Sequence, residues 1–335
     1  MNKKNVLVIA GVLVIAVLFA FQVVSSKTEA PDDNWPNGVK LVMHVPYGAG
    51  GGGDTMVRQF LPYWEKELGT NIIIENRPGA SGMVGTKVWM EQPKDGTHIL
   101  FLCQLYLSGN ILLQGADYKI DDFDVINFQQ LDPVSICVTE DSPYQTIDDL
   151  IDAIRENPGK LTYGTIPGGH GQLAMEFLKD KLNLDFKLIT YDAGAKYRTA
   201  LLGKHVDFIA GNAAGDLSLK GAAKVLAVSD SERNSIWPDA PTFNEVLAKY
   251  DIEGFPPTGS SRAFSVSPTL KTEYPKRYQK LVDSYKNAYE NPAYQEALKK
   301  SGEDSISHYY GAEESNKLNR ELHQTMDAYK DKMTI

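Results

Sequence analysis

The sequence contains only two cysteines, Cys103 and Cys137, among 335 residues. Two thiols cannot build a disulfide scaffold or a four-thiolate zinc site. Both cysteines lie in apolar stretches, so one disulfide or two buried free thiols would fit equally well. A basic tract is also missing, because 34 Lys and Arg face 43 Asp and Glu and the net charge is −9. Nucleic-acid binding requires clustered cations, so this composition argues against it.

Catalytic and metal-binding motifs are missing as well. The six histidines show neither HExxH nor any paired ligand spacing. No GxSxG motif places a serine on a nucleophile elbow, and no Gly-Lys-Ser/Thr follows the glycine-rich segment near residue 50. The remaining composition, 42% hydrophobic and 23% charged, is that of an ordinary globular protein. The sequence therefore predicts a globular protein with no metal and no cofactor.

One long apolar run is present, at the N-terminus. Val6–Val24 is apolar except for Gln22, and it follows Lys3 and Lys4. This order is typical of a secretory signal, although the run is also just long enough to span a bilayer. We therefore expect residues 1–30 to be a signal peptide or a membrane anchor, and the rest of the chain to be extracytoplasmic. Removing them would take away three lysines and one glutamate and leave a net charge of −11.

Short β-rich runs alternate with helical patterns along the chain. The predicted strands are residues 39–45, 71–75, 97–102, 131–139, 161–163, 186–190, 206–210 and 224–228. The predicted helices are 54–68, 147–156, 172–182, 196–202 and most of the chain after residue 275. This alternation is typical of largely parallel sheets covered by helices, and two sheets are favoured over one. The order strand, glycine-rich loop, helix occurs twice, near residues 45 and 163.

The first glycine-rich loop is the most informative feature of the sequence. Residues 46–54 read PYGAGGGGD, between a predicted strand and a predicted helix. Glycine lets backbone N–H groups approach a ligand closely, and a helix N-terminus favours an anion. A flexible turn with Asp54 as the N-cap is the structural alternative. We predict an anion site whose candidate residues here are Tyr47, Gly48, Ala49, Gly50, Gly51, Gly52 and Gly53.

The same loop also fits a dinucleotide-binding fingerprint. Gly48, Gly50 and Gly53 match GxGxxG, and Glu75 follows 22 residues after the last of them. Against this interpretation, Pro46-Tyr47 interrupts the junction between strand and turn. An exported protein would also meet no pool of nicotinamide cofactor. An NAD-dependent oxidoreductase is therefore the alternative hypothesis.

A second glycine-rich loop reads YGTIPGGHG over residues 163–171. Its candidate ligand residues are Thr165, Gly168, Gly169 and His170, although His170 could equally be a solvent-facing loop residue. Two such loops in the two halves of an α/β chain predict two lobes that hold one anionic ligand across a cleft. Ser81, within GASG, is expected either at a tight turn near this cleft or at a helix cap.

Specific segments follow one another in a recognisable order: VPYGAGGGGD, ENRPGASGMVGTKVW, KDGTHILF, LLGKHVDFIAGN and KVLAVSDSERNSIWPDAPTFNEV. They resemble the solute receptors of tripartite tricarboxylate transporters, the TctC/Bug family, from about residue 38 to the end. The resemblance implies an α/β, two-lobed periplasmic-binding-protein (type II) fold with two crossing strands and a cleft between the lobes. It implies a monomeric receptor, not an enzyme, that captures a di- or tricarboxylate or a related organic acid. Its partners would be the membrane permease subunits of such a transporter.

On this resemblance we expect lobe 1 to comprise residues 38–139 and 227–335, and lobe 2 residues 140–226. The crossing strands would be 133–139 and 224–229.

Further site residues carry over from the same resemblance. Tyr191, Gly194 and Asn212 would line the cleft together with the two loops. The family usually has Ser or Thr where this chain has Gly52 and Gly53. Because few cations stand in the matched loops, we expect oriented backbone N–H groups to supply the attraction for the acid.

Overall fold

The structure is a computed structural model that describes residues 34–252, 254–255 and 258–333. The expected signal or anchor at residues 1–30 lies outside the described residues. Pro36–Ile335 form one compact unit. Its strands are β1 (Leu41–Val45), β2 (Ile72–Asn76), β3 (His98–Cys103), β4 (Asp124–Pro133), β5 (Ser135–Thr139), β6 (Thr162–Thr165), β7 (Lys187–Thr190), β8 (Phe208–Ala210), β9 (Ala223–Val228) and β10 (Gly259–Val266). Its α-helices are α2 (Gly52–Leu68), α3 (Met83–Met90), α4 (Gln104–Leu112), α5 (Ile147–Glu156), α6 (His170–Leu182), α7 (Gly194–Leu202), α8 (Phe243–Ala248), α9 (Pro268–Glu273), α10 (Pro275–Tyr289), α11 (Pro292–Ser301) and α12 (Gly311–Asp327).

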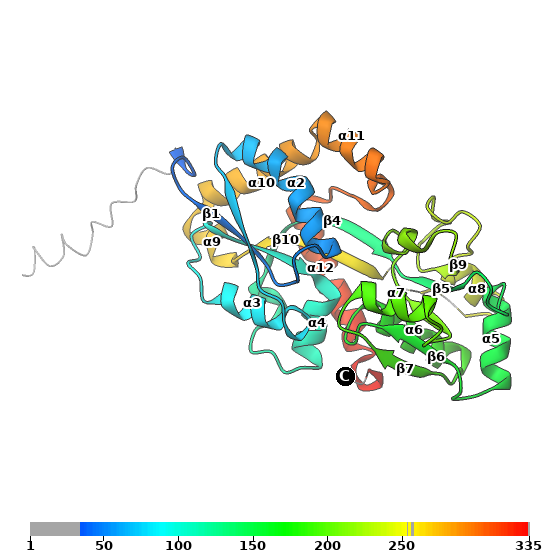
Figure 1. Ribbon diagram of the computed structural model, residues 1–335. Helices are drawn as coiled ribbons and strands as arrows, with labels where there is room; N and C mark the ends of the chain where they lie inside the picture. Colours follow the sequence, from blue (N-terminus) through cyan, green and yellow to red (C-terminus); the bar gives the residue numbers. More distant parts are fainter. Residues whose placement is uncertain (1–33, 253, 256–257, 334–335) are drawn as a thin grey trace, which may run out of the picture. The chain divides into compact units, whose positions relative to one another are not determined.

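The strands form two five-stranded sheets with matching topology (Figure 1). The first sheet has the order β2-β1-β3-β10-β4, and the second has the order β7-β6-β8-β5-β9. In each sheet, the fourth strand of this order, β10 or β5, runs antiparallel to its neighbours. The sheets are thus mixed rather than wholly parallel. The antiparallel strand is in each case the one by which the chain arrives from the other sheet: β5 in the second sheet and β10 in the first. The expected α/β architecture with two sheets is confirmed.

The chain passes between the sheets at two places that are bonded to each other. Val134 separates β4 of the first sheet from β5 of the second, and the chain returns to the first sheet at β10, which begins just after Thr258. The N–H of Val134 donates to Ser229 Oγ at 2.7 Å, and the N–H of Ser229 donates to the Val134 carbonyl at 2.8 Å. The Ser229 hydroxyl donates in turn to the carbonyl of Thr258 at 2.6 Å, just before β10. These bonds fasten the two crossings together.

The strand pairing corrects the expected boundaries. Residues 131–139, expected as one strand, are the end of β4 and all of β5, and β5 pairs with β8 and β9 in the second sheet. The change of sheet therefore comes at Val134 rather than after Thr139. The physical reason is that Pro133 has no N–H to continue the ladder, and the next strand finds its partners in the other sheet.

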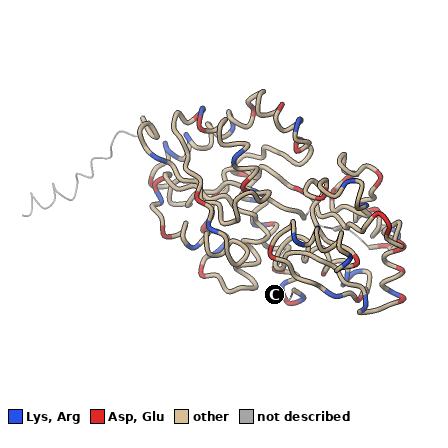
Figure 2. The backbone as a smooth tube through the Cα atoms, viewed as in Figure 1, with Lys and Arg blue, Asp and Glu red and all other residues tan. Residues whose placement is uncertain are grey.

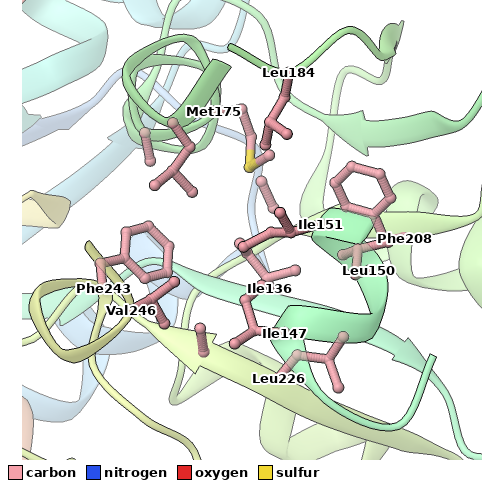
Figure 3. Packing of buried hydrophobic residues seen from close by; sticks show 14 of the residues in the cluster. Ile136, Ile147, Leu150, Ile151, Met175, Leu184, Phe208, Leu226, Phe243 and Val246 are labelled. Atoms are coloured by element: carbon pink, nitrogen blue, oxygen red, sulfur yellow. The ribbon is translucent and has the colours of Figure 1, made fainter. Parts of the chain in front are cut away.

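The core beneath the second sheet also takes in chain that was expected in the first lobe. Phe243 and Val246 of α8 pack with Ile136 of β5 and Ile151 of α5 (Figure 3). Phe255 joins the same cluster. Helix α8 and Phe255 therefore pack with the second sheet, because α8 buries its apolar side there.

Helix α5 shows how local sequence sets an element's bounds. Thr146 Oγ1 accepts the N–H of Asp149 at 3.1 Å, and the Asp149 carboxylate accepts the N–H of Thr146 at 2.8 Å. This reciprocal capping box satisfies two N–H groups at the start of the helix. Pro158 follows the C-terminus and disfavours continuation. The helix spans Ile147–Glu156, as predicted.

The two cysteines are free and buried, on different sheets. Cys103 ends β3 of the first sheet, whereas Cys137 lies within β5 of the second. Of the two possibilities left open by the sequence, the structure has two buried thiols.

Candidate functional site

The two glycine-rich loops have the same backbone construction. Gly50 has φ +76° and donates its N–H to the Asp54 carboxylate at 2.8 Å. Gly168 has φ +72° and donates its N–H to the side-chain carbonyl of Gln172, also at 2.8 Å. Both φ values lie in the left-handed region that favours glycine. Each helix begins two residues after this glycine. The predicted repetition of strand, glycine loop and helix is confirmed at this level of detail.

Both helices also approach their sheet through a second glycine. A Cβ on Gly53 would lie 2.5 Å from the Phe101 ring of β3. A Cβ on Gly171 would lie 2.3 Å from Thr165 Oγ1 and 2.5 Å from the carbonyl oxygen of Ala210. Real side chains do not tolerate such distances. These glycines therefore allow the first turn of α2 and of α6 to lie directly against the strand ends.

The first loop presents its backbone to solvent. Its exposed residues are Gly48, Ala49, Gly50, Gly51 and Gly52. Helix α2 begins at Gly52 with Gly51 as N-cap and no side-chain cap bond among the described residues. Asp54 is therefore not the N-cap; its buried carboxylate instead accepts from Gly50, Arg58 and Asn76 and holds the loop. The first-turn N–H groups stand at the positive end of a helix of 17 residues.

Aromatic rings link the first loop to the second. Tyr47 packs near Tyr106 of α4 with ring centroids 6.4 Å apart, and Tyr106 meets His170 edge-on at 5.6 Å. A Cβ on Gly169 would lie 2.2 Å from the Tyr106 ring, and one on Gly109 would lie 2.2 Å from the Gly168 carbonyl oxygen. Helix α4 therefore contacts the second loop directly. The structure places Tyr47, Gly169 and His170 around Tyr106, with Gly168 against Gly109 of the same helix.

Some predicted site groups are engaged within the fold. The Tyr47 hydroxyl accepts the N–H of Cys103 at 3.2 Å, and the Thr165 hydroxyl donates to the Ala210 carbonyl at 2.8 Å. The Tyr191 ring lies against Gly164, where a Cβ would be 3.1 Å from it. These contacts tie the side chains to their own sheet.

Ser81 lies in a strained turn beside Tyr47. Gly79, Ala80, Ser81 and Gly82 all have positive φ, which is 51° at Ser81. A Cβ on Gly82 would lie 3.1 Å from the Tyr47 hydroxyl oxygen. Glycine adopts positive φ readily, so the cost falls on Ala80 and Ser81, and such strain concentrates at functional sites. The structure thus has the turn rather than the helix cap.

Asn212 joins a buried charge network between the sheets. Arg198 of α7 donates from Nε to Asp216 Oδ1 at 2.7 Å and from Nη2 to Asn212 Oδ1 at 3.0 Å. Asn212 donates its Nδ2 to the carboxylate of Asp132, at the end of β4. The other oxygen of Asp132 accepts the N–H of Ala214 at 2.9 Å. Because Asp132 belongs to the first sheet, Asn212 bridges the two sheets.

Gly194 and Gly215 make room for this network. A Cβ on Gly194 would lie 2.8 Å from Arg198 Nη1, and one on Gly215 would lie 2.3 Å from Arg198 Nη2. The N-terminal residue of α7 is therefore adjacent to a guanidinium.

A second arginine, Arg262, stands at the first loop. Strand β10 pairs it with Cys103 of β3 and Gln130 of β4. Its Nη2 would lie 3.1 Å from a Cβ on Gly52, at the start of α2, and its Nη1 donates to Gln130 Oε1. Sequence reasoning missed both arginines and expected few cations. Neither belongs to a glycine loop, so only strand and helix packing could have placed them there.

His170 is uncharged in this setting. Burial, together with the positive charges of Arg262 and Arg198, lowers the pKa of His170 to about 3. The second loop therefore contributes no cation of its own. Figure 2 shows Lys and Arg interleaved with Asp and Glu along the described chain, so the charge of the site is local.

The pKa of His170 predicts a specific loss of stability in acid. Because the folded-state pKa lies below the unfolded value of 6.5, the unfolded chain binds more protons. The contribution of the neutral His170 to the free energy of unfolding is fully present above pH 6.5, and it decreases as the pH falls from 6.5 towards 3. We expect wild type to lose up to about 1.4 kcal/mol more per pH unit than His170→Gln in urea unfolding. His205→Gln, at an exposed histidine, is the control, and parallel profiles for wild type and His170→Gln would contradict the assignment.

A separate cavity of about 470 Å³ lies beside the crossings between the sheets. Its walls include Pro133, Ser229, Thr258, His308 and Tyr310. None of its lining residues belongs to either glycine loop. This cavity is the competing location for a small molecule.

Solved structures share this arrangement of two sheets. The periplasmic binding protein BugD is 25% identical, with a TM-score of 0.71 over 87% of this chain and 95% of its own. MatC from Rhodopseudomonas palustris, solved with malate, is 19% identical with a TM-score of 0.70 over 88% of this chain and 98% of its own. Rpa4515 of R. palustris, solved with adipate, is 21% identical with a TM-score of 0.69 over 89% and 96%. The fold is that of the periplasmic binding proteins.

Sequence comparisons then define the family. Residues 56–330 match the family described as tripartite tricarboxylate transporter family receptor. The UPF0065 protein in the gbd 5′ region of Cupriavidus necator is 30% identical over 307 residues, which are 90% of this chain and 89% of that protein. The chain belongs to the TctC family of tripartite tricarboxylate transporter receptors.

Family membership confirms the resemblance found in the sequence and decides between the two hypotheses. The family and its structural neighbours are substrate-binding receptors and not enzymes, so the oxidoreductase alternative is set aside. Receptors of this family are periplasmic. Among the described residues, none of the helices combines the length and the apolar character needed to cross a membrane.

Proposed function

We propose that this chain is an extracytoplasmic solute receptor that captures a small carboxylate between its two glycine-rich loops. The ligand is a di- or tricarboxylate or a related organic acid, and it is delivered to the permease subunits of a tripartite tricarboxylate transporter. The N-terminal segment exports the chain as a signal or holds it as an anchor, and the receptor acts as a monomer.

One observation carries this proposal: the N-terminus of α2 is open to solvent and has a guanidinium beside it. Gly51 and Gly52 are exposed, and Arg262 reaches the first turn of the helix. Helix N-termini favour anions through free N–H groups and the helix dipole. Malate and adipate, the ligands of two proteins with the same fold, are both dicarboxylates. Because Gly52 and Gly53 stand where the family usually has Ser or Thr, backbone N–H groups rather than hydroxyl groups make the contacts of this loop to the carboxylate.

In this proposal, the two lobes close on the acid. The lobes correspond to the two sheets, and the hinge is formed by the crossings at Val134 and just before β10, which Ser229 joins through its hydrogen bonds to Val134 and Thr258. Closure excludes water, which strengthens each contact between an N–H group and the carboxylate. The permease would recognise the closed state, which the ligand populates through its higher affinity for it.

Isothermal titration calorimetry tests the proposal. We expect at least one acid among malate, adipate, succinate and citrate to bind with a Kd of about 1 μM or tighter. The matching neutral amides should give no heat, because they lack the anionic group that the site attracts. No binding by any acid, or equal binding of acid and amide, would overturn the proposal.

A pair of variants locates the binding site within this test. Gly52→Val inserts bulk beside Arg262 and the first helical turn, and we expect about tenfold weaker binding or worse. Ala293→Val, which adds bulk at an exposed residue of α11 outside both loops, is the control. Similar affinity for both variants would place the ligand away from the first loop.

A further inference from the structure

Arg262 differs from every other arginine in the chain. The sequence has eight arginines, and seven of them have a carboxylate oxygen within 4.0 Å: Arg58, Arg77, Arg155, Arg198, Arg233, Arg277 and Arg320. Within the described part of the chain, Arg262 has none. Its hydrogen-bond partner is the neutral side chain of Gln130. The half-buried guanidinium of Arg262 therefore carries a positive charge at the first loop that no carboxylate of the described residues pairs with.

The acidic groups nearest to Arg262 are poorly suited to neutralise it. Asp132 and Glu303 feel its charge, yet burial raises the pKa of both carboxyl groups. Asp132 is already bonded to Asn212 and to the N–H of Ala214. The carboxylates close to Arg262 are thus either occupied or biased towards their neutral form.

The position of Arg262 connects the two loops. Its guanidinium lies at the first turn of α2, beside Gly52, and its charge also acts on His170 of the second loop and on Tyr106 between them. Arg198 acts on the same two groups from the second sheet. The two arginines differ in one decisive respect, because Arg198 is neutralised by Asp216 at 2.7 Å.

We propose that Arg262 is the specificity-determining cation of the site and binds a carboxylate of the ligand together with the first-turn N–H groups of α2. This inference rests on the proposed function. The planar guanidinium presents two parallel N–H donors to a carboxylate, which a carboxamide cannot match with its single acceptor oxygen. Arg262 therefore selects ionised acids over amides of the same shape. It also resolves how a chain of net charge −9 attracts an anion, by a local unpaired cation.

The test compares Arg262→Gln, Arg262→Lys and wild type by calorimetry. The ligands are the tightest-binding acid of the series and its amide. We expect Arg262→Gln to bind the acid about 100-fold more weakly and to lose discrimination against the amide. Arg262→Lys keeps the positive charge but not the two parallel N–H donors of the guanidinium, so it should bind the acid about tenfold more weakly than wild type. Arg155→Gln, at an exposed arginine paired with Asp152, should bind like wild type.

Binding of the acid by Arg262→Gln within about threefold of wild type would overturn the inference. If Arg262→Gln does not fold, Arg262→Lys decides, and wild-type affinity and discrimination in that variant would overturn it equally. A failure of the proposed function is seen separately, as wild type binding none of the acids. In that case about 100 mM formate is the probe, and thermal melting is the readout. Stabilisation by formate that requires an arginine at position 262 supports the inference, and equal stabilisation of wild type and variant, or none of either, overturns it.

Discussion

Replacing Asp216 with alanine should lower the free energy of unfolding by about 3–5 kcal/mol. The Asp216 side chain is fully buried, and that of Arg198 is only 16% exposed. Removing the carboxylate would leave a buried guanidinium that, among the described residues, keeps a hydrogen bond to Asn212 alone. It would also leave the hydroxyl of Ser135 without the acceptor that it uses. Urea unfolding followed by circular dichroism measures the change.

The chain offers a matched control for this substitution. Asp192 pairs with Lys196 of the same helix α7, also at 2.7 Å, but both side chains are more than 60% exposed. Asp192→Ala should therefore change the free energy of unfolding far less than Asp216→Ala does, because solvent screens an exposed ion pair. A loss for Asp216→Ala as small as that for Asp192→Ala would contradict the account. Asp216→Leu combined with Arg198→Met should recover much of the stability, because no unpaired charge then remains buried.

The second large effect is expected at Gly171. Replacing a glycine inside a helix with alanine normally raises the free energy of unfolding by about 0.5–1 kcal/mol. Here we expect the opposite sign, with Gly171→Ala costing about 1–3 kcal/mol. The new methyl would press on the hydrogen bond from the Thr165 hydroxyl to the Ala210 carbonyl, and a backbone oxygen cannot move aside. Binding of the acid should weaken as well, because α6 and its loop would be displaced.

Thermal and urea denaturation of three Gly→Ala variants shows whether the loss of stability comes from the steric clash at each position or from replacing glycine as such. Gly48→Ala has open space around its Cβ and should leave stability within about 0.5 kcal/mol of wild type. Gly53→Ala meets the Phe101 ring, which can move, so its cost should lie between those of the other two. A gain in stability for Gly171→Ala would show that α6 does not depend on this close approach.

The repeated loop was the part of the site that the sequence predicted best. Glycine at Gly50 and Gly168 is required by positive φ, and glycine at Gly53 and Gly171 by contact with a strand. Such requirements act locally, so they leave a readable pattern. The same holds for α5, whose capping box fixes its start.

The cations of the site were not predictable from local pattern. Arg262 lies in a strand that begins Gly-Ser-Ser and carries no apolar alternation at its start. It reaches the first loop only because β10 pairs with β3, whose partner residue is Cys103. If Arg262 binds the ligand as proposed, backbone N–H groups do not act alone. A charge contributed from more than 200 residues away requires knowledge of the strand order.

The single strand expected over residues 131–139 divides between two sheets for a related reason. Residues 131–139 read LDPVSICVT and carry no clear break in hydropathy, so the sequence predicts one strand there. In the structure, Pro133 ends the ladder of the first sheet and Ser135 begins that of the second. Pairing partners rather than hydropathy decide the sheet to which a residue belongs.

The most direct test of the central claim is a crystal structure of the receptor with the acid that binds most tightly in calorimetry. The account predicts a carboxylate within hydrogen-bonding distance of the N–H groups of Gly52 and Gly53 and of the Arg262 guanidinium, facing the second loop at Gly168–His170. An acid bound instead in the cavity beside Ser229 and His308, with both glycine loops empty, would contradict it.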